Sequence, residues 1–405
     1  MTILFPTISS AIQDINNRGI YPDLIRKFVS EGHQVYVIFP SDRSGTLTMT
    51  ESGNIKLLGV PFFKITKASL LERTYAMLRI SSVFSAAVER NFPDVKFDLI
   101  LYSTPPVTFN RLLQKFKKKH KAFTYLMLKD IFPQNAVDLG LLNKSGIMYK
   151  HFRRSEKELY KLSDFIGCMS PANVNYVSRA EGPLVKNKIG ICPNAIEIQR
   201  RPFTQSQKIE VRQKNNLPSH KTLVVYGGNL GRPQGVEFLL EIIKEFSNDP
   251  KVHFLICGSG TETHKVADFI DESELSNVTF FEGLGRDVYE DLEASADIAL
   301  VFLNKAFTIP NFPSRILSYM EHALPILFSV DSATDVGKVA EEGSFGIATQ
   351  YGDMEEFSNK LLHLEGNPEL RDVMGKKGLD YLKKHFTTDE AYRLIISKID
   401  HVSNN

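Results

Sequence analysis

Short apolar runs alternate along the chain with stretches in which apolar residues recur every three or four positions. The first series of runs predicts strands at 2–5, 34–39, 98–102, 122–127, 164–168 and 189–191, with helices near 19–30, 70–90, 107–119, 146–161 and 172–179. A second series predicts strands at 221–226, 252–257, 278–281, 298–302 and 325–328, followed by helices near 353–363, 367–384 and 387–398. Strands that alternate with helices favour parallel sheets, so the pattern predicts an α/β fold with two Rossmann-like units.

The length of the chain supports this division. Its 405 residues exceed what one hydrophobic core usually holds, so we expect two domains, 1–195 and 196–385. The polar, unpatterned stretch 200–208 is typical of a linker. We expect the last helix, within 386–405, to return to the first domain.

The composition, with 42% hydrophobic and 24% charged residues, is that of an ordinary soluble protein. No apolar stretch reaches the roughly 20 residues of a membrane span, and the N-terminus has no signal-peptide pattern, so we expect a cytoplasmic protein. Cys168, Cys192 and Cys257 lie far apart in strand-like runs, which predicts buried, reduced thiols.

The net charge of +2 conceals an asymmetry between the two halves. Residues 1–195 carry 27 Lys and Arg against 15 Asp and Glu, a charge of +12, which leaves −10 for the remainder. Basic clusters at 115–121 and 149–154 interleave cations with aromatic residues, a pattern that attracts anionic lipid headgroups. A solvated helix face is the alternative for either cluster. No nucleic-acid-binding module accompanies the charge, so we expect no nucleic-acid partner. The cations that we predict to contact a membrane or acceptor are Lys117, Lys118, Lys119, Arg153 and Arg154.

The most informative loop follows the strand predicted at 221–226. Four glycines, at 227, 228, 231 and 235, let the backbone approach a ligand, and the next helix offers unpaired N–H groups to an anion. Arg232 adds a permanent cation. The spacing matches neither a P-loop nor a dinucleotide-binding fingerprint at the first strand. The loop therefore predicts a phosphate site, with a purely structural glycine turn as the alternative.

Two further segments follow strands of the same predicted sheet. Gly258–Gly260 is a short glycine turn that could border a base or sugar. Pro313 and Ser314 predict a helix start that offers a second anion contact. Ser318 and Glu321 are three residues apart on that helix, so they share a face and could reach sugar hydroxyls. A solvated surface position is the alternative for Glu321.

Several segments resemble retaining glycosyltransferases of family 4, which have two facing Rossmann-like domains (the GT-B fold). Asn17–Gly19, Glu31–Val35 and Pro193–Glu197 are similar to first-domain segments of that family. Asp130–Gly140, Gly228–Gly231 with Gln234–Gly235, and Pro313–Met320 resemble bacterial O-antigen and capsule transferases of the N-acetylfucosaminyl type. The resemblance covers nearly the whole chain.

This resemblance implies that a sugar moves from a UDP-sugar, N-acetylfucosamine by subgroup. The basic charge of the first half and the lack of a membrane span fit a polyprenyl-diphosphate-linked glycan as the acceptor. The acceptor hydroxyl would attack from the face that the diphosphate leaves, in a cleft between the domains, at the inner membrane surface and without a metal or other cofactor. Asp130 and Arg232 are the catalytic candidates. The donor-binding candidates are Gly19, Gly228, Asn229, Gln234, Gly258, Ser259, Gly260, Ser314, Arg315, Ser318 and Glu321.

One departure from the family concerns Ser318, which stands where members carry a Glu that contacts donor hydroxyls. Glu321 could compensate, the donor could bind differently, or activity could be lower. Two other functions therefore stay open: a nucleotide-sugar 2-epimerase on the same architecture, and a non-catalytic partner that binds a nucleotide sugar.

Overall fold

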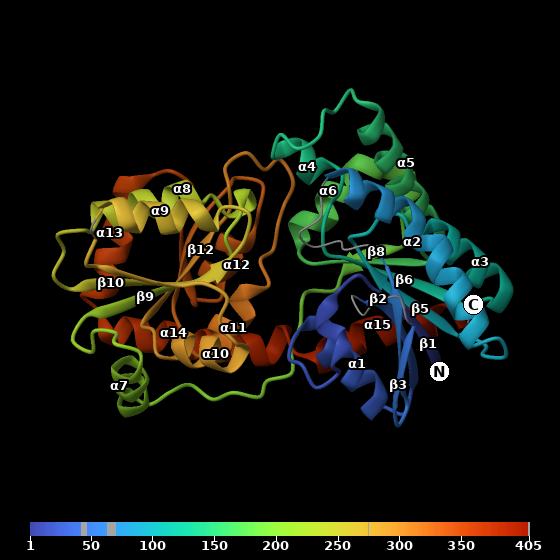
Figure 1. Cartoon of the computed structure of the whole chain (residues 1–405), viewed down its shortest axis with the longest axis horizontal. Helices are drawn as coiled ribbons and strands as arrows, with labels where there is room; N and C mark the ends of the chain where they lie inside the picture. The colour runs from blue at the N-terminus through green and yellow to red at the C-terminus, as the bar shows by residue number, and fades with distance from the viewer. Residues whose placement is uncertain (42–46, 63–69, 274, 404–405) are drawn as a thin grey trace. The chain divides into compact units, whose positions relative to one another are not determined.

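The computed structural model describes residues 1–41, 47–62, 70–273 and 275–403. It divides into two compact units, one formed by Met1–Glu197 with Phe386–Asn405 and the other by Ile198–His385. The boundaries predicted at 195 and 385 lie within two residues of these limits. Both units have the predicted α/β architecture of strands joined by helices (Figure 1).

Unit 1 is built around a mostly parallel sheet. In the described ranges, its eight strands run in the order β3-β4-β2-β1-β5-β6-β7-β8, and only β3 is antiparallel to its neighbour. The strands are β1 Thr2–Pro6, β2 Gln34–Ser41, β3 Thr48–Ser52, β4 Ile55–Pro61, β5 Leu99–Ser103, β6 Phe123–Leu128, β7 Phe165–Cys168 and β8 Ile189–Ile191. The helices are α1 Ile20–Ser30, α2 Leu70–Asn91, α3 Asn110–His120, α4 Gln134–Asp138, α5 Ile147–Leu162 and α6 Pro171–Glu181.

The final helix, α15 (Thr388–Ser403), belongs to unit 1 and packs on α1. Ile395 and Ala391 enter the same apolar core as Phe28 of α1. The Lys27 ammonium lies 2.5 Å from an Asp389 carboxylate oxygen, which adds an ion pair to this contact.

Unit 2 has a wholly parallel sheet. Over its described residues, six strands run in the order β11-β10-β9-β12-β13-β14. They are β9 Thr222–Asn229, β10 Val252–Ser259, β11 Val278–Phe281, β12 Ile298–Phe302, β13 Ile326–Val330 and β14 Gly346–Gln350. The helices are α7 Gln205–Lys214, α8 Val236–Glu245, α9 Thr263–Ser273, α10 Arg286–Ala294, α11 Arg315–Glu321, α12 Val336–Glu342, α13 Met354–Glu365 and α14 Pro368–His385.

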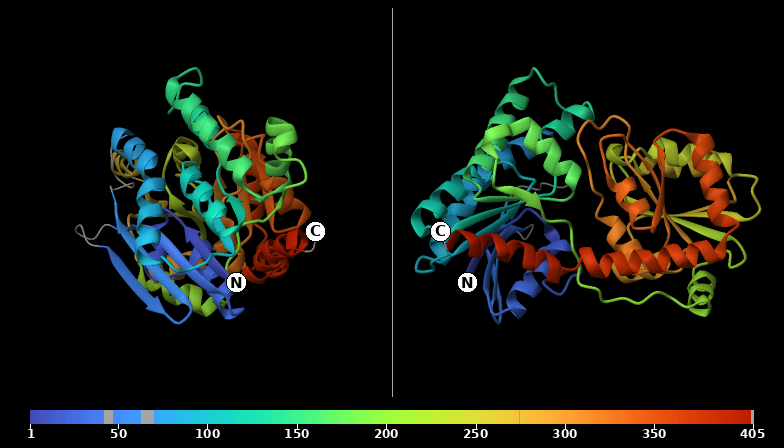
Figure 2. Two further views of the ribbon diagram at one scale, coloured as in Figure 1. Left: turned by 90° about the vertical axis from the view of Figure 1, so that its right-hand side faces the viewer. Right: turned by 180° about the vertical axis from the view of Figure 1, so that it is seen from behind.

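Strands β9 and β10 are nearly continuous apolar runs, as expected of strands that are buried on both faces of a parallel sheet. Val224 and Tyr226 of β9 and Phe254 and Ile256 of β10 face one apolar layer, which also holds Phe238 of α8. Helices cover both faces of the sheet (Figure 2). Since all the strands are parallel, their carboxyl ends meet at one edge, where ligands bind in folds of this kind.

Part of the segment predicted as a linker is helical. A capping box at Thr204, whose hydroxyl accepts from the Gln207 amide while the Gln207 side chain accepts from the Thr204 amide, starts α7. The Arg212 guanidinium is buried and pairs with the Asp297 carboxylate at 2.7 Å. The polar composition of this segment did not predict α7, because the helix is stabilised by its capping hydrogen bonds and by the Arg212–Asp297 ion pair.

The cysteine prediction agrees with the structure. Cys168, Cys192 and Cys257 are free and buried, and burial raises the pKa of each thiol.

Candidate active site in unit 2

The carboxyl ends of β9 and β10 form a glycine-lined cavity of about 310 Å³. Gly228 and Gly258 pair across the two strands, as do Asn229 and Ser259. A Cβ atom on Gly258 would lie 2.0 Å from the Gly228 carbonyl oxygen, so this close approach requires glycine. The cavity is lined by Gly228, Asn229, Cys257, Gly258, Ser259, Gly283, Leu284 and Tyr289. Four predicted donor residues thus share one cavity with residues that the sequence did not single out.

The rest of the glycine loop is a short 3-10 turn, η3 (Arg232–Gln234), that leads into α8. Gly235 precedes the helix with φ at 61°, in the left-handed region. The Asn229 amide donates to the Gln234 side-chain oxygen at 2.6 Å, and the Asn304 amide donates to the Arg232 carbonyl at 3.0 Å. The Arg232 side chain is exposed. The loop is therefore braced from within and displays a cation to solvent beside the cavity.

A second cation, Arg315, lies beneath the glycine loop. Its guanidinium lies over the Tyr226 ring, 4.8 Å from the ring centroid, and 3.5 Å from where a Cβ of Gly228 would be. The Nη1 atom is buried, and no hydrogen-bond partner reaches it in the part of the chain that the structure describes. The Tyr319 hydroxyl, one turn along α11, accepts from the Gly227 amide at 2.9 Å. Helix α11 thus fixes the loop and places a buried positive charge under it.

Ser318 contacts a carboxylate that the sequence analysis missed. Its hydroxyl donates to one oxygen of Glu293, and the hydroxyl of Tyr289, which lines the cavity, donates to the other. Glu293 is fully buried, and this burial raises its pKa to about 7. Sequence offered little signal, because α10 lies 25 residues before Ser318 and Glu293 occupies an ordinary core-facing helix position.

The predicted donor contact of Glu321 stays a prediction, and the structure shows that this carboxylate has backbone partners. The Glu321 carboxylate is buried and accepts from the backbone amides of Gln199 at 2.7 Å and Arg200 at 2.8 Å. A carboxylate engaged in this way holds the chain segment at 199–200. The spacing of three residues correctly predicts that Glu321 lies near Ser318 on the helix. It does not predict the backbone partners at 199 and 200.

Ser314 precedes α11 and is exposed, and Gly260 follows β10. A Cβ on Gly260 would lie 2.1 Å from the Leu230 carbonyl oxygen. Gly260 therefore lets the backbone pass close to Leu230, and it is not among the residues that line the cavity.

Two predicted residues lie in unit 1. Asp130 follows β6, where its carboxylate accepts from the Asn135 amide at 2.6 Å, and burial raises its pKa to about 6. Gly19 caps α1, and its amide donates to the Asp23 carboxylate at 2.9 Å. A carboxyl group whose pKa is raised toward neutrality is suited to proton handling or to polar ligand contacts.

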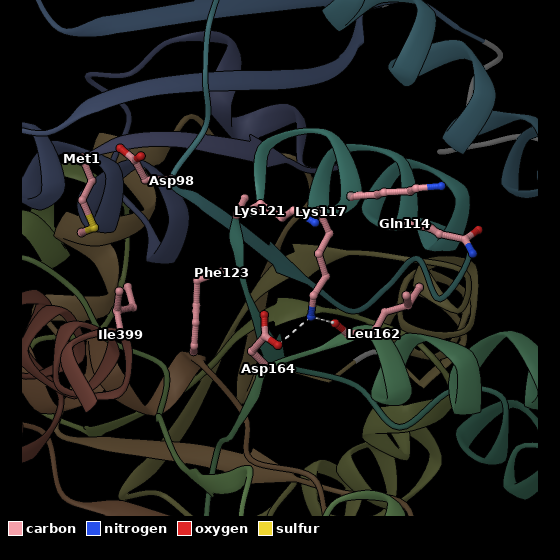
Figure 3. A pocket seen from close by; sticks show the side chains of 11 residues that line it. Met1, Asp98, Gln114, Lys117, Lys121, Phe123, Leu162, Asp164 and Ile399 are labelled. Atoms are coloured by element: carbon pink, nitrogen blue, oxygen red, sulfur yellow. Dashed lines mark hydrogen bonds and ion pairs between the residues drawn. The ribbon is translucent and has the colours of Figure 1, made fainter. Parts of the chain in front are cut away.

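The predicted membrane cations separate into two groups. The Lys117 ammonium lies in a cavity of about 720 Å³ at the amino ends of the unit 1 strands, 2.6 Å from Asp164 and 2.8 Å from the Leu162 carbonyl (Figure 3). Arg153 pairs with Glu156 and Glu181. Both cations are thus paired with carboxylates, and their contact with a membrane stays a prediction. Lys118, Lys119 and Arg154 are exposed.

Comparison with known proteins decides what kind of domain holds the glycine-lined cavity. Residues 207–381 match the family described as glycosyl transferases group 1. Most of unit 2 is thus similar to a group 1 glycosyltransferase domain. All the cavity residues fall within the matched range.

Two curated relatives extend the likeness beyond the glycosyltransferase domain. The probable glycosyltransferase WbjE of Pseudomonas aeruginosa is 25% identical over 82% of this chain and 81% of its own. The putative colanic acid biosynthesis glycosyl transferase WcaI of Escherichia coli K12 is 22% identical over 79% of this chain and 81% of its own.

Solved structures show the same fold. Sucrose-phosphate synthase from Thermosynechococcus elongatus superposes with a TM-score of 0.75 at 14% identity, with each chain fully covered. Anabaena Alr3699/HepE in complex with UDP-glucose gives a TM-score of 0.70 at 14% identity, covering 99% of this chain and 100% of the other. The predicted two-unit GT-B fold is confirmed. Among the described helices, none combines the length and apolar character needed to cross a bilayer.

Proposed function

We propose that this protein is a retaining glycosyltransferase that moves a sugar from a UDP-sugar to a lipid-linked glycan during synthesis of a bacterial surface polysaccharide. The observation that carries the proposal is the glycine-lined cavity at the carboxyl ends of β9 and β10, with Arg232 beside it and Arg315 beneath it, inside the range that matches group 1 glycosyl transferases. Its volume suits part of a nucleotide sugar.

The related proteins support the donor and the pathway class. A structural neighbour, Alr3699/HepE, holds UDP-glucose, and a curated relative is named for colanic acid biosynthesis. The resemblance of Asp130–Gly140 and Pro313–Met320 to N-acetylfucosaminyl-type transferases makes UDP-N-acetylfucosamine the first donor to try.

In the proposed mechanism, the main task of the protein is to neutralise the charge that grows on the departing diphosphate. Arg232, Arg315 and the first amides of α8 supply positive charge and N–H donors at one edge of the sheet. One well-placed donor of this kind is worth about 10²–10³ in rate. The acceptor hydroxyl enters on the face that the diphosphate leaves, so the anomeric configuration is retained, and no metal is required.

The buried Glu293 carboxyl supports a role for Ser318 in an active site. Together with the Ser318 and Tyr289 hydroxyls it makes a polar group beside the cavity, although residue 318 carries no carboxylate of its own. This observation favours an active enzyme over a non-catalytic binding partner. We assign Asp130 to orienting the acceptor or the transferred sugar.

Unit 1 carries the positive charge, so we assign it the polyprenyl-diphosphate-linked acceptor and a peripheral contact with anionic lipid at the inner face of the cell membrane.

The test is a nucleotide-release assay with a panel of UDP- and GDP-sugars and membranes of a polysaccharide-producing bacterium as the acceptor source. We expect acceptor-dependent UDP release from one donor, lowered about 10²–10³-fold by Arg232→Ala. Lys338→Ala removes an exposed cation that pairs with Glu342 on α12, and we expect it to keep full activity. Conversion of the donor without acceptor would indicate an epimerase. Donor binding without release across the panel would indicate a non-catalytic partner.

A further inference from the structure

The connection between α4 and α5 projects from the body of unit 1, as two views of the molecule show (Figures 1 and 2). This connection and the first turn of α5 expose three large apolar side chains. Leu141 is 55% exposed, Ile147 85% and Met148 36%. Buried apolar residues are the rule in a folded unit, so a cluster of exposed ones at a projecting tip marks a contact surface.

Hydrogen bonds within the tip fix this exposure. The Leu141 amide donates to the Ala136 carbonyl at 2.8 Å, the Gly146 amide to the Asn143 carbonyl at 2.9 Å, and the Ser145 amide to the Asn143 side-chain oxygen at 2.9 Å. Gly146 then starts α5, so Ile147 is its first residue. The hydrogen-bonded turn at 141–146 therefore fixes the backbone in the conformation that exposes these apolar side chains.

Cations surround these apolar residues. Lys144 precedes Ile147, and Lys150 and Arg154 follow it at helical spacing on the exposed face of α5. The opposite face of the helix holds Phe152 and Leu159 in the core. The sequence from 139 to 157 contains one acidic residue, Glu156, which is buried and paired with Arg153.

We propose that this tip, residues 141–154, is the part of the protein that enters the surface of an anionic lipid bilayer. Exposed apolar side chains in the projecting connection and the first turn of α5, with exposed cations before and after them in the chain, suit a bilayer surface, where acyl chains lie beneath anionic headgroups. The convex shape and one-signed charge favour a lipid surface over a protein partner, which would need a complementary acidic patch. The proposal rests on the proposed function, since a lipid-linked acceptor places the enzyme at a membrane.

The same reasoning disfavours the basic stretch 115–121 as the insertion point. Lys117 is paired with Asp164. The apolar residues of α3, Leu112, Leu113 and Phe116, are all buried, so its exposed face offers Lys118 and Lys119 without an apolar side chain between them. Such a cationic face attracts anionic lipid headgroups but has no apolar side chain that could insert among the acyl chains.

The test is sedimentation of the whole protein with vesicles of phosphatidylcholine, alone or with phosphatidylglycerol. We expect binding to the anionic vesicles that weakens at least tenfold in Ile147→Ser/Met148→Ser and in Lys144→Gln/Lys150→Gln/Arg154→Gln. The matched control is Val373→Ser, which removes a 54% exposed apolar side chain from α14 and should bind like the parent. Lys118→Gln/Lys119→Gln should lose less binding than either tip variant.

Equal binding by the tip variants and the parent would overturn the proposal, as would a loss confined to Lys118→Gln/Lys119→Gln. An oligomer in solution that the Ile147→Ser/Met148→Ser variant dissociates would show that a second copy occupies the tip, which also overturns it. UDP release with a detergent-solubilised acceptor should be equal in the parent and in Ile147→Ser/Met148→Ser. That readout separates failure of this proposal from failure of the proposed glycosyltransferase activity.

Discussion

Replacing the buried Glu293 carboxyl by an amide should change how the stability of the protein depends on pH. Burial raises the pKa of Glu293 from 4.5 to about 7, so the folded chain keeps this proton at pH values where the unfolded chain has released it. A shift of about 2.5 units corresponds to about 3 kcal/mol, since each unit is worth about 1.4 kcal/mol. The Gln in Glu293→Gln keeps the shape of the side chain but cannot ionise.

The sign follows from proton binding. The stabilisation by the neutral carboxyl is complete below pH 4.5 and is lost as the pH rises through about 7. We therefore expect the stability of the parent, relative to Glu293→Gln, to fall by about 3 kcal/mol over this interval. Because Asp130 and Glu156 also have raised pKa values, only this difference between parent and variant isolates Glu293.

The assay is urea unfolding at a series of pH values between 4 and 8, roughly spanning the interval over which the two states release the proton. The chain has no Trp, so far-ultraviolet circular dichroism follows the transition. Glu342→Gln, which removes an exposed carboxylate from α12, controls for the loss of one charge. A difference between parent and Glu293→Gln that stays constant across the series would refute the assignment of Glu293 as a buried carboxyl that is neutral below pH 7.

Three further predictions address the site. In Gly258→Ala, the new Cβ would lie 2.0 Å from the Gly228 carbonyl oxygen, so β9 and β10 must separate. We expect a loss of about 1–3 kcal/mol in the free energy of unfolding and weaker UDP binding by calorimetry. The control is Gly285→Ala, whose new Cβ meets nothing within 4 Å and which should change neither quantity. If ionised Asp130 orients a substrate, kcat falls as the pH drops through about 6, and Asp130→Asn should flatten this limb of the pH–rate profile while lowering its plateau. Chelation by EDTA should leave the transfer rate unchanged, and a loss that Mg²⁺ or Mn²⁺ restores would contradict the metal-free mechanism.

Much of the fold could be predicted from the hydrophobic pattern, because buried parallel strands such as 252–259 and 298–302 are continuous apolar runs. Three strands were not predicted, namely β3 and β14 at sheet edges and β4 between β3 and β2. Strand β3 is polar and largely exposed, and β14 is short and only partly buried. Their existence depends on a neighbouring strand that offers hydrogen bonds, which local pattern does not show.

The candidate site could be predicted where local geometry demands a residue type, as glycine does at 228 and 258. It could not be predicted where the partner comes from elsewhere in the chain. Ser318 meets Glu293 from α10, and Lys117 meets Asp164 from the start of β7. In each case the tertiary fold decides whether a polar side chain faces a ligand, a lipid or a buried carboxylate.

Glycosyl transfer to a lipid-linked acceptor can be measured as transfer of radiolabelled sugar from a UDP-sugar into the lipid extract of acceptor membranes. The account predicts label in the lipid fraction that depends on acceptor and enzyme, is lost with Arg232→Ala, and is attached with the anomeric configuration of the donor. Label that stays in the aqueous fraction for every donor, while the protein binds UDP, would contradict the assignment as a glycosyltransferase acting on a lipid-linked glycan.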